Sequence, residues 1–165
     1  VRRLADAAAG VPVGVHVKVD TGMHRAGVWP PSELPAFVGR VVAAGLRVDG
    51  TWTHLAMSAD DPEETGRQLD RFDAAVGAVR AAGHDPGVLH AANTGAVLLH
   101  PRAHLDLVRP GIGLYGLLPA PGVGAPWRRW TGGDAQVAAR GRPGSRSPGR
   151  FWRSSACAGG VCSLR

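Results

Sequence analysis

The chain has 165 residues, enough for one ordinary domain with its own core, and its formal net charge is +6. Eight of its 19 Lys and Arg residues, but only one of its 13 Asp and Glu residues, lie from Ala125 onward, so the first 124 residues carry a net charge of −1. This near-neutral body argues against nucleic acid as a partner. No signal-peptide pattern opens the chain and no apolar run approaches the ~20 residues of a membrane span, so a cytoplasmic protein without membrane contact is expected.

The first predicted strand runs from Val13 to Asp20. Its valines stand at every second position and alternate with Gly14, His16 and Lys18, which is the period-two pattern of a strand with one apolar face. A polar turn, residues 21–25, follows directly. The pattern therefore places charged side chains at the carboxyl end of a strand.

The next segment predicts a helix and a second strand. Ser32 is the predicted N-cap, and Pro35 falls in the first turn, where proline is tolerated. One helical face carries Leu34, Phe37, Val38, Val41 and Val42. The glycine of "AAG" at 43–45 ends the helix, and residues 46–56 predict the strand.

A stronger helix signal begins at Asp61, which is followed by Pro62 and, three residues after the cap, by Glu64. The predicted buried stripe of this helix consists of Leu69, Phe72, Val76 and Val79. A second "AAG", at 81–83, ends the helix. The two helices therefore end in the same way, about one strand-helix unit apart.

A third strand is predicted around "GVLHAAN", residues 87–93, with a short helix from Thr94. A fourth strand with a glycine-rich turn is predicted over residues 104–116. Alternating strands and helices indicate an α/β fold with a parallel sheet, open or closed. Polar residues at or just beyond the four strand ends are then expected to share one site, because active sites lie at that rim in barrels. They are Arg25, His54, Asn93 and Arg109.

The pattern stops near the C-terminus, and residues 123–165 are predicted to be a disordered basic tail. Gly, Pro, Arg and Ser dominate there, so little apolar surface is available to offset the entropy of ordering. Cys157 and Cys162 lack a second pair of ligands, so no zinc site is expected. A shifted reading frame in the gene is one hypothesis for this abrupt change.

Four blocks of the body resemble the alanine racemase family in its order and approximate spacing. They are "VKVDTGMHRAGV", "TWTHLAMSADD" with Gln68 and Phe72 following, "LHAANTGA" and "LDLVRPGIGLYG". That family is pyridoxal-phosphate dependent (fold type III), with an N-terminal (β/α)8 TIM barrel and a C-terminal β-domain. The resemblance implies that residues 1–122 are a partial barrel of about four βα units.

The resemblance also implies roles for individual residues in binding pyridoxal 5'-phosphate. Gly111 and Ile112 match backbone donors to its phosphate, and Thr94 matches a hydroxyl donor. Asn93 lies beside Thr94 and is expected to order the same loop. Arg109 matches the arginine that faces the pyridine nitrogen, where a guanidinium keeps its proton.

Three further matches lie on the first two blocks. His54 matches a histidine placed against the cofactor ring. Arg25 matches the arginine that meets the phenolic oxygen and the substrate carboxylate. Lys18 matches a lysine that is carbamylated in many relatives and orients Arg25. No metal is implied.

Two departures from the family pattern concern catalysis. The family's Schiff-base lysine precedes the first block, and Lys18, the only lysine, matches another role. The family's second base is a tyrosine of the β-domain, supplied across a homodimer, and Tyr115, the only tyrosine, does not match it. The sequence therefore predicts no catalytic residue and an inactive fragment, with any residual cofactor binding weak.

The implied parent reaction interconverts L-alanine and D-alanine for cell-wall peptidoglycan. Two alternatives stay open: a non-catalytic pyridoxal-phosphate-binding module, and a racemase of another amino acid. A nucleic-acid-binding protein acting through the basic tail is disfavoured, because the body has neither a stacking platform nor a basic stripe.

Overall fold

A computed structural model describes residues 1–115 and 117–120. The predicted tail, residues 123–165, lies outside these described residues. The helices and strands in chain order are α1 (Arg2–Ala8), β1 (Gly14–Lys18), α2 (Leu34–Ala43), β2 (Arg47–Trp52), α3 (Pro62–Ala81), β3 (Val88–His90) and α4 (Thr94–Leu99). Short 3-10 helices span Pro31–Glu33, Pro101–Ala103 and Gly111–Tyr115.

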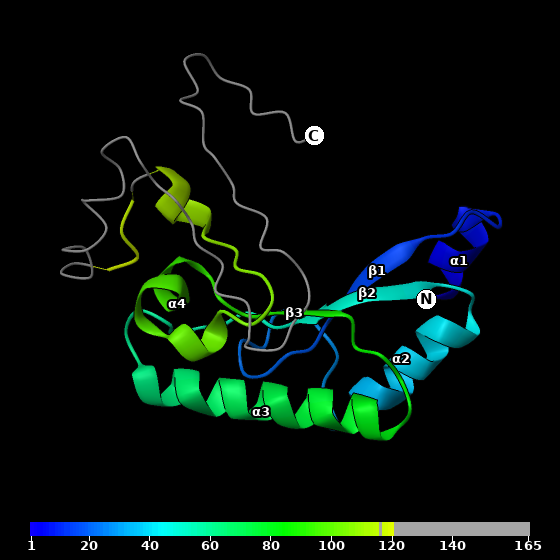
Figure 1. Ribbon diagram of the computed structural model, residues 1–165, viewed down its shortest axis with the longest axis horizontal. Coiled ribbons are helices and arrows are strands. Elements are labelled where there is room, and N and C mark those ends of the chain that lie inside the picture. Colours follow the sequence, from blue (N-terminus) through cyan, green and yellow to red (C-terminus); the bar gives the residue numbers. More distant parts are fainter. Residues whose placement is uncertain (116, 121–165) are drawn as a thin grey trace, which may run out of the picture.

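The strands form one parallel sheet in the order β1-β2-β3, with α2 and α3 on the same side of it (Figure 1). Parallel neighbours require a crossover connection, and α2 and α3 supply the two crossovers. The predicted α/β class with a parallel sheet is confirmed. In the described part of the chain, no helix has the length and apolar composition that a membrane crossing needs.

The pairing of β1 with β2 contains a bulge. Val15 lies opposite Val48, but His16 lies opposite Gly50, so Asp49 is one extra residue in β2. Val17 is then opposite Thr51. Val48 and Thr51, which are three positions apart, therefore both face the helix side of the sheet. In a strand with simple alternation, residues three positions apart face opposite sides.

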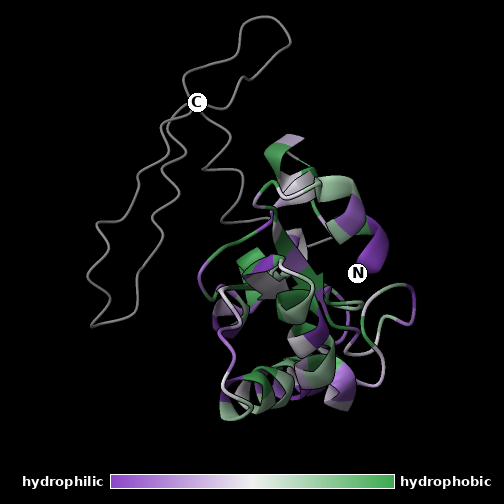
Figure 2. Ribbon diagram, turned by 90° about the vertical axis from the view of Figure 1, so that its right-hand side faces the viewer, coloured by the Kyte–Doolittle hydropathy of each residue, from purple (hydrophilic) through white to green (hydrophobic). Residues whose placement is uncertain are grey.

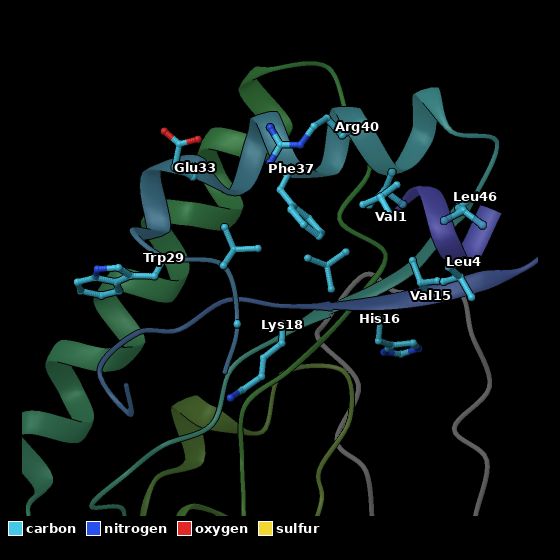
Figure 3. A pocket seen from close by; sticks show the side chains of 14 residues that line it. Val1, Leu4, Val15, His16, Lys18, Trp29, Glu33, Phe37, Arg40 and Leu46 are labelled. Carbon is cyan, nitrogen blue, oxygen red and sulfur yellow. The ribbon is translucent and has the colours of Figure 1, made fainter. Parts of the chain in front are cut away.

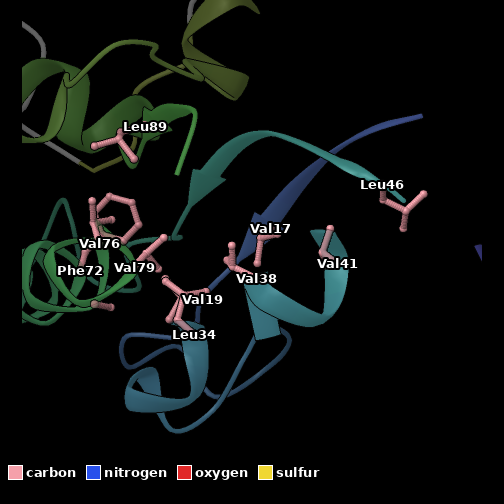
Figure 4. Packing of buried hydrophobic residues seen from close by; sticks show 11 residues of the cluster. Val17, Val19, Leu34, Val38, Val41, Leu46, Phe72, Val76, Val79 and Leu89 are labelled. Carbon is pink, nitrogen blue, oxygen red and sulfur yellow. The ribbon is translucent and has the colours of Figure 1, made fainter. Parts of the chain in front are cut away.

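The main core lies between the helix side of the sheet and helices α2 and α3 (Figure 4). All four residues of the stripe predicted for α3 are buried: Leu69, Phe72, Val76 and Val79. In α2 the stripe is narrower than predicted, since Val42 is 49% exposed. Helix α1 contributes no buried residue, and its start beside the N-terminus is hydrophilic (Figure 2).

The two predicted N-caps have different outcomes. Asp61 caps α3 as predicted, and its carboxylate accepts a hydrogen bond from the Glu64 N–H at 2.8 Å. Ser32 does not cap α2. It lies inside the 3-10 helix Pro31–Glu33, because Pro31 with its fixed φ already begins a tighter turn, and α2 starts at Leu34 without a side-chain cap.

The prediction of a fourth strand over residues 104–116 is wrong, and the described sheet has three strands. Only one backbone bridge joins this segment to β3, between Leu107 and His90. Leu105 has φ 48°, outside the strand region, and the Asp106 carboxylate accepts the Leu89 N–H at 2.9 Å. A side chain therefore takes a donor that a strand carbonyl would otherwise use, and the segment continues into the 3-10 helix Gly111–Tyr115.

Candidate functional site

A pocket of about 350 Å³ lies at the carboxyl end of the sheet and brings together most of the predicted site residues. Its size falls within the range of small-molecule sites, roughly 300–1,000 Å³. Its lining includes His54, Asn93, Thr94, Arg109, Gly111 and Ile112, together with Asp60 from the segment before α3. Arg25 and Lys18 do not line it.

Asn93 uses its whole side chain to order the loops around this pocket. Its Oδ1 accepts hydrogen bonds from the Ala96 N–H at 3.1 Å and from the Ser58 hydroxyl at 2.6 Å. Its Nδ2 donates to the Leu55 carbonyl at 3.0 Å. Asn93 therefore caps α4 and joins it to the loop after β2.

Thr94 joins helix α4 to the 3-10 helix Gly111–Tyr115. Its hydroxyl oxygen accepts a hydrogen bond from the N–H of Gly113, a buried residue, at 3.1 Å. The hydroxyl proton stays available for donation to a ligand. The bond holds the Gly111–Ile112 backbone at the pocket next to Thr94.

Arg109 is fixed where β2 and β3 end. Its Nη2 donates to the carbonyls of Thr53 at 2.8 Å and Ala91 at 3.2 Å, and its guanidinium lies 4.7 Å from the ring centroid of Trp52. Its Nη1 donates to Nδ1 of His90 at 2.6 Å. Burial lowers the pKa of Arg109, but a guanidinium stays charged. Three of its five N–H groups are thus used inside the protein.

His90 was not among the predicted site residues, although it stands inside a quoted block. Arginine can only donate, so Nδ1 of His90 must carry a lone pair and Nε2 must carry the proton. That Nε2–H then donates to Nδ1 of His16 at 2.8 Å. Burial, then Arg109 and His16, lower the pKa of His90 to about 4, which keeps the ring neutral at pH 7.

The contact between the two histidines depends on a glycine. A Cβ on Gly50 would lie 2.5 Å from Nδ1 of His16, so the His16 ring crosses β2 only because residue 50 has no side chain. His16, Lys18, Trp52 and His90 share the face of the sheet away from the helices. The strand alternation at His16 and Lys18 is the sequence signal for this polar face.

His54 is half-buried near three cations. Burial lowers its pKa, and the charges of Arg109, Lys18 and Arg25 lower it further. The imidazole is therefore neutral at pH 7. Arg25 itself is exposed, yet it lies close enough to affect His54. At the carboxyl end of the sheet, His54, Asn93 and Arg109 thus line one pocket, and Arg25 lies outside its lining but near His54.

Asp20 orders the turn that carries Arg25. Its Oδ1 accepts from the backbone N–H groups of Gly22, Met23 and His24 at 2.9, 3.0 and 3.1 Å, and its Oδ2 accepts from that of Arg25 at 3.1 Å. Burial alone would raise the pKa of Asp20, but these four donors hold it below its ordinary value. Asp20 stood at the predicted strand end without an assigned role.

Lys18 contacts the same turn from the other side. Its Nζ donates to the carbonyl of Ala26 and lies 5.4 Å from the Trp52 ring centroid. It also lines a second and larger pocket of about 570 Å³, between β1 and α2, where Phe37 points toward the strand (Figure 3). That pocket holds none of the other predicted site residues.

The comparisons with known proteins agree with the fold and with these blocks. The model of the family described as alanine racemase, N-terminal domain, matches residues 1–119. The chain belongs to the alanine racemase family. An alanine racemase of Symbiobacterium thermophilum is 48% identical over 119 residues, which is 68% of this chain and 30% of the relative.

Solved alanine racemases share the fold. The structure from Streptomyces coelicolor A3(2) aligns with a TM-score of 0.70 at 40% identity, over 75% of this chain and 34% of its own. That from Bacillus anthracis with bound L-Ala-P aligns with a TM-score of 0.65 at 28% identity, over 73% and 33%. The chain thus spans about a third of the alanine racemases it matches.

The described residues contain no group of three or more His, Cys, Asp or Glu side chains that could hold a metal ion. In this member of the alanine racemase family, the groups described above surround the 350 Å³ pocket at the end of the sheet. Its pocket offers a hydroxyl, a backbone turn and a fixed guanidinium beside a neutral imidazole.

Replacing Asp20 by asparagine is expected to destabilise the chain most at neutral pH. The N–H groups of residues 22–25 lose a charged acceptor, and a hydrogen bond to a charged group typically contributes about 1.5–3 kcal/mol to the free energy of unfolding. Because the pKa of Asp20 is depressed in the folded state, its contribution is complete above the ordinary value of 3.8 and is lost as the pH falls through the folded-state pKa.

Urea unfolding of both chains between about pH 3 and pH 7 measures this effect. The difference between wild type and Asp20→Asn should be largest near pH 7 and should shrink on acidification. A difference that is constant with pH would show that the ionised carboxylate does not hold the turn.

Proposed function

We propose that the chain is part of an alanine racemase barrel and that the 350 Å³ pocket is its pyridoxal 5'-phosphate site. The observation that carries the proposal is the bond from Gly113 to Thr94, which places the Gly111–Ile112 backbone and a hydroxyl beside Arg109. In this proposal the three-stranded sheet is one arc of a (β/α)8 barrel, and the site lies at the rim where barrels carry their active sites.

The residues present fit the cofactor. Its phosphate needs several N–H or O–H donors, which the Thr94 hydroxyl and the Gly111–Ile112 turn supply. Arg109 keeps two of its five N–H groups beyond its contacts with His90, Thr53 and Ala91, so it can donate to a ring nitrogen while holding its own charge. When bound, pyridoxal 5'-phosphate supplies an electron-withdrawing ring that makes the α-proton of a bound amino acid more acidic.

The remaining residues bind and orient. Arg25, on the turn held by Asp20, would meet the carboxylate of a small amino acid such as alanine, and the neutral imidazole of His54 would lie against the cofactor ring. Lys18 supports the turn through Ala26, and carbamylation would give it a negative charge toward Arg25. The parent enzyme would act as a cytoplasmic homodimer that interconverts L-alanine and D-alanine for peptidoglycan.

The chain alone is proposed to be inactive. Its only lysine, Lys18, is bonded to Ala26 and lines the other pocket, and its only tyrosine, Tyr115, is 83% exposed. The absence of a lysine from the cofactor pocket also favours a second candidate, a non-catalytic pyridoxal-phosphate-binding module. A racemase of another amino acid stays a third, since the pocket described here does not define the substrate side chain.

Titration of the ¹⁵N-labelled chain with pyridoxal 5'-phosphate, followed by NMR, tests the cofactor site. We expect shifts at Thr94 and at Gly111–Gly113, with a dissociation constant on the order of 1 mM or weaker because no lysine binds the group covalently. Thr94→Val keeps the shape and removes the hydroxyl, so it should weaken binding about tenfold or more. Borohydride reduction should leave no covalent adduct at Lys18.

Thr65→Val is the matched control, because the hydroxyl of this buried threonine on α3 donates to the Asp61 carbonyl and Thr65 does not line the pocket. It should leave the affinity unchanged. Shifts confined to the larger pocket near Trp29 and Phe37, equal affinity of Thr94→Val and wild type, or a stable adduct at Lys18 would contradict the proposal.

A further inference from the structure

Gln68 is a fully buried polar side chain between the two loops that carry Arg25 and His54. It lies in α3, two helical turns from the Asp61 cap, and its exposed fraction is 0%. A buried amide without partners would be strongly unfavourable, so its hydrogen bonds show what the position requires.

The amide group is bonded to both loops. Nε2 donates to the Thr21 hydroxyl oxygen and to the His54 carbonyl, each at 3.3 Å, and Oε1 accepts the Ala56 N–H at 2.9 Å. Thr21 also shares a hydrogen bond of 2.7 Å with the hydroxyl of Thr53. One side chain thus joins the turn after β1 to the segment after β2.

A second contact presses the same turn against α3. Arg71 donates to the Thr21 carbonyl at 2.8 Å and forms an ion pair with Glu64 at 2.7 Å. A Cβ on Gly22, whose φ is +143°, would lie 3.3 Å from both the Arg71 Nη1 and the Glu64 Oε1. The turn that ends in Arg25 therefore packs directly on the surface of α3.

We propose that Gln68 is a positioning residue, which sets the distance between the turn carrying Arg25 and the loop carrying His54. Its role in a cofactor site rests on the proposed function, whereas its effect on the two loops does not. The position needs a donor and an acceptor on one side chain of this length, which glutamine supplies and a carboxylate or an apolar side chain does not.

The pKa of His54 reports this spacing directly. Burial lowers it, and the cations Arg109, Lys18 and Arg25 lower it further, while Asp60 is the acid that lines the same pocket. Lys18 ends β1 and Arg25 lies on the turn after it, whereas His54 lies on the loop after β2. Loops that move apart expose His54 and take it away from two of the three cations, so its pKa should rise.

The test is an NMR titration of the histidine ring protons in the full 165-residue chain. Gln68→Met keeps the volume and removes all three hydrogen bonds, and it should raise the pKa of His54 toward its ordinary value of 6.5. Thr21→Val removes the other end of one bond and should raise it less. The double variant should give less than the sum of the two shifts, because both act on one contact.

Val79→Ala controls for a general loss of stability. Val79 is equally buried in α3 but belongs to the core at the other end of the helix, so this variant should unfold more easily without moving the pKa of His54. The positioning role is overturned if Gln68→Met shifts the pKa of His54 no more than Val79→Ala does. It is also overturned if the pKa shifts of Gln68→Met and Thr21→Val add fully in the double variant.

Cofactor titration of the same variants separates this inference from the proposed function. A wild-type chain that binds no pyridoxal 5'-phosphate, with His54 still shifted in Gln68→Met, overturns the proposed function and supports the positioning role. Cofactor binding that is unchanged in Gln68→Met, with an unshifted His54, overturns the positioning role alone.

Discussion

No alanine racemase turnover is expected from the 165-residue chain, even with saturating pyridoxal 5'-phosphate. Racemisation removes a proton from one face of the α-carbon and delivers one to the other, and each positioned acid–base group contributes about 10²–10⁴-fold. Lys18 donates to the Ala26 carbonyl away from the pocket and Tyr115 is exposed, so neither is expected to act as such a group. A rate equal to that of free pyridoxal phosphate should remain.

A D-alanine assay coupled to a D-amino acid oxidase measures this rate. Lys18→Arg, which keeps the charge and the contact with Ala26, serves as the control and should give the same background. Turnover above free pyridoxal phosphate that disappears in Lys18→Arg would show that this lysine is a catalytic base, and the assignment of Lys18 to the Arg25 turn would then be wrong.

Among the substitutions considered, replacing Phe72 by alanine is expected to lower the free energy of unfolding most. Phe72 is fully buried between α3 and the sheet, with Val19, Leu34 and Val76 in the same core (Figure 4). Truncating a core phenylalanine typically lowers the free energy of unfolding by about 3–5 kcal/mol, a large part of the 5–15 kcal/mol of an ordinary domain. The variant should be largely unfolded under conditions where the wild type is folded.

Phe37→Ala is the matched control, since it makes the same substitution at a half-buried position facing the larger pocket. Circular dichroism during urea unfolding should show a clearly smaller loss for Phe37→Ala than for Phe72→Ala. Equal losses would mean that the core lies elsewhere than between α3 and the sheet.

Features set by neighbouring residues were predictable from the sequence. The Asp61 cap, the proline after it and the stripe of α3 follow local rules, and the structure agrees with each. The resemblance of four blocks identified the family. The strand alternation around Lys18 also indicated which side chains share a face, before any neighbouring strand was known.

Features set by partners distant in the chain were not predictable in this way. The prediction of a fourth strand is wrong because the backbone of Leu105 has a positive φ, and because the Asp106 side chain, instead of a backbone carbonyl, accepts the Leu89 N–H. The role of His90 depends on His16 lying across Gly50, and that of Gln68 depends on two loops meeting one helix. These contacts join residues that are far apart in the chain, so no local sequence pattern predicts them.

The extra residue Asp49 in β2 has a consequence for how the site can change in evolution. Every side chain after it faces the opposite side from the one it would face if simple alternation continued through Asp49. Deleting Asp49 alone would remove the bulge and leave Val48, Gly50, Thr51 and Trp52 in simple alternation, so Trp52 would still face away from the helices. In evolution β2 should therefore tolerate the loss of one residue at the bulge, whereas a one-residue deletion in β1, which carries no extra residue, would reverse the faces of the side chains that follow it.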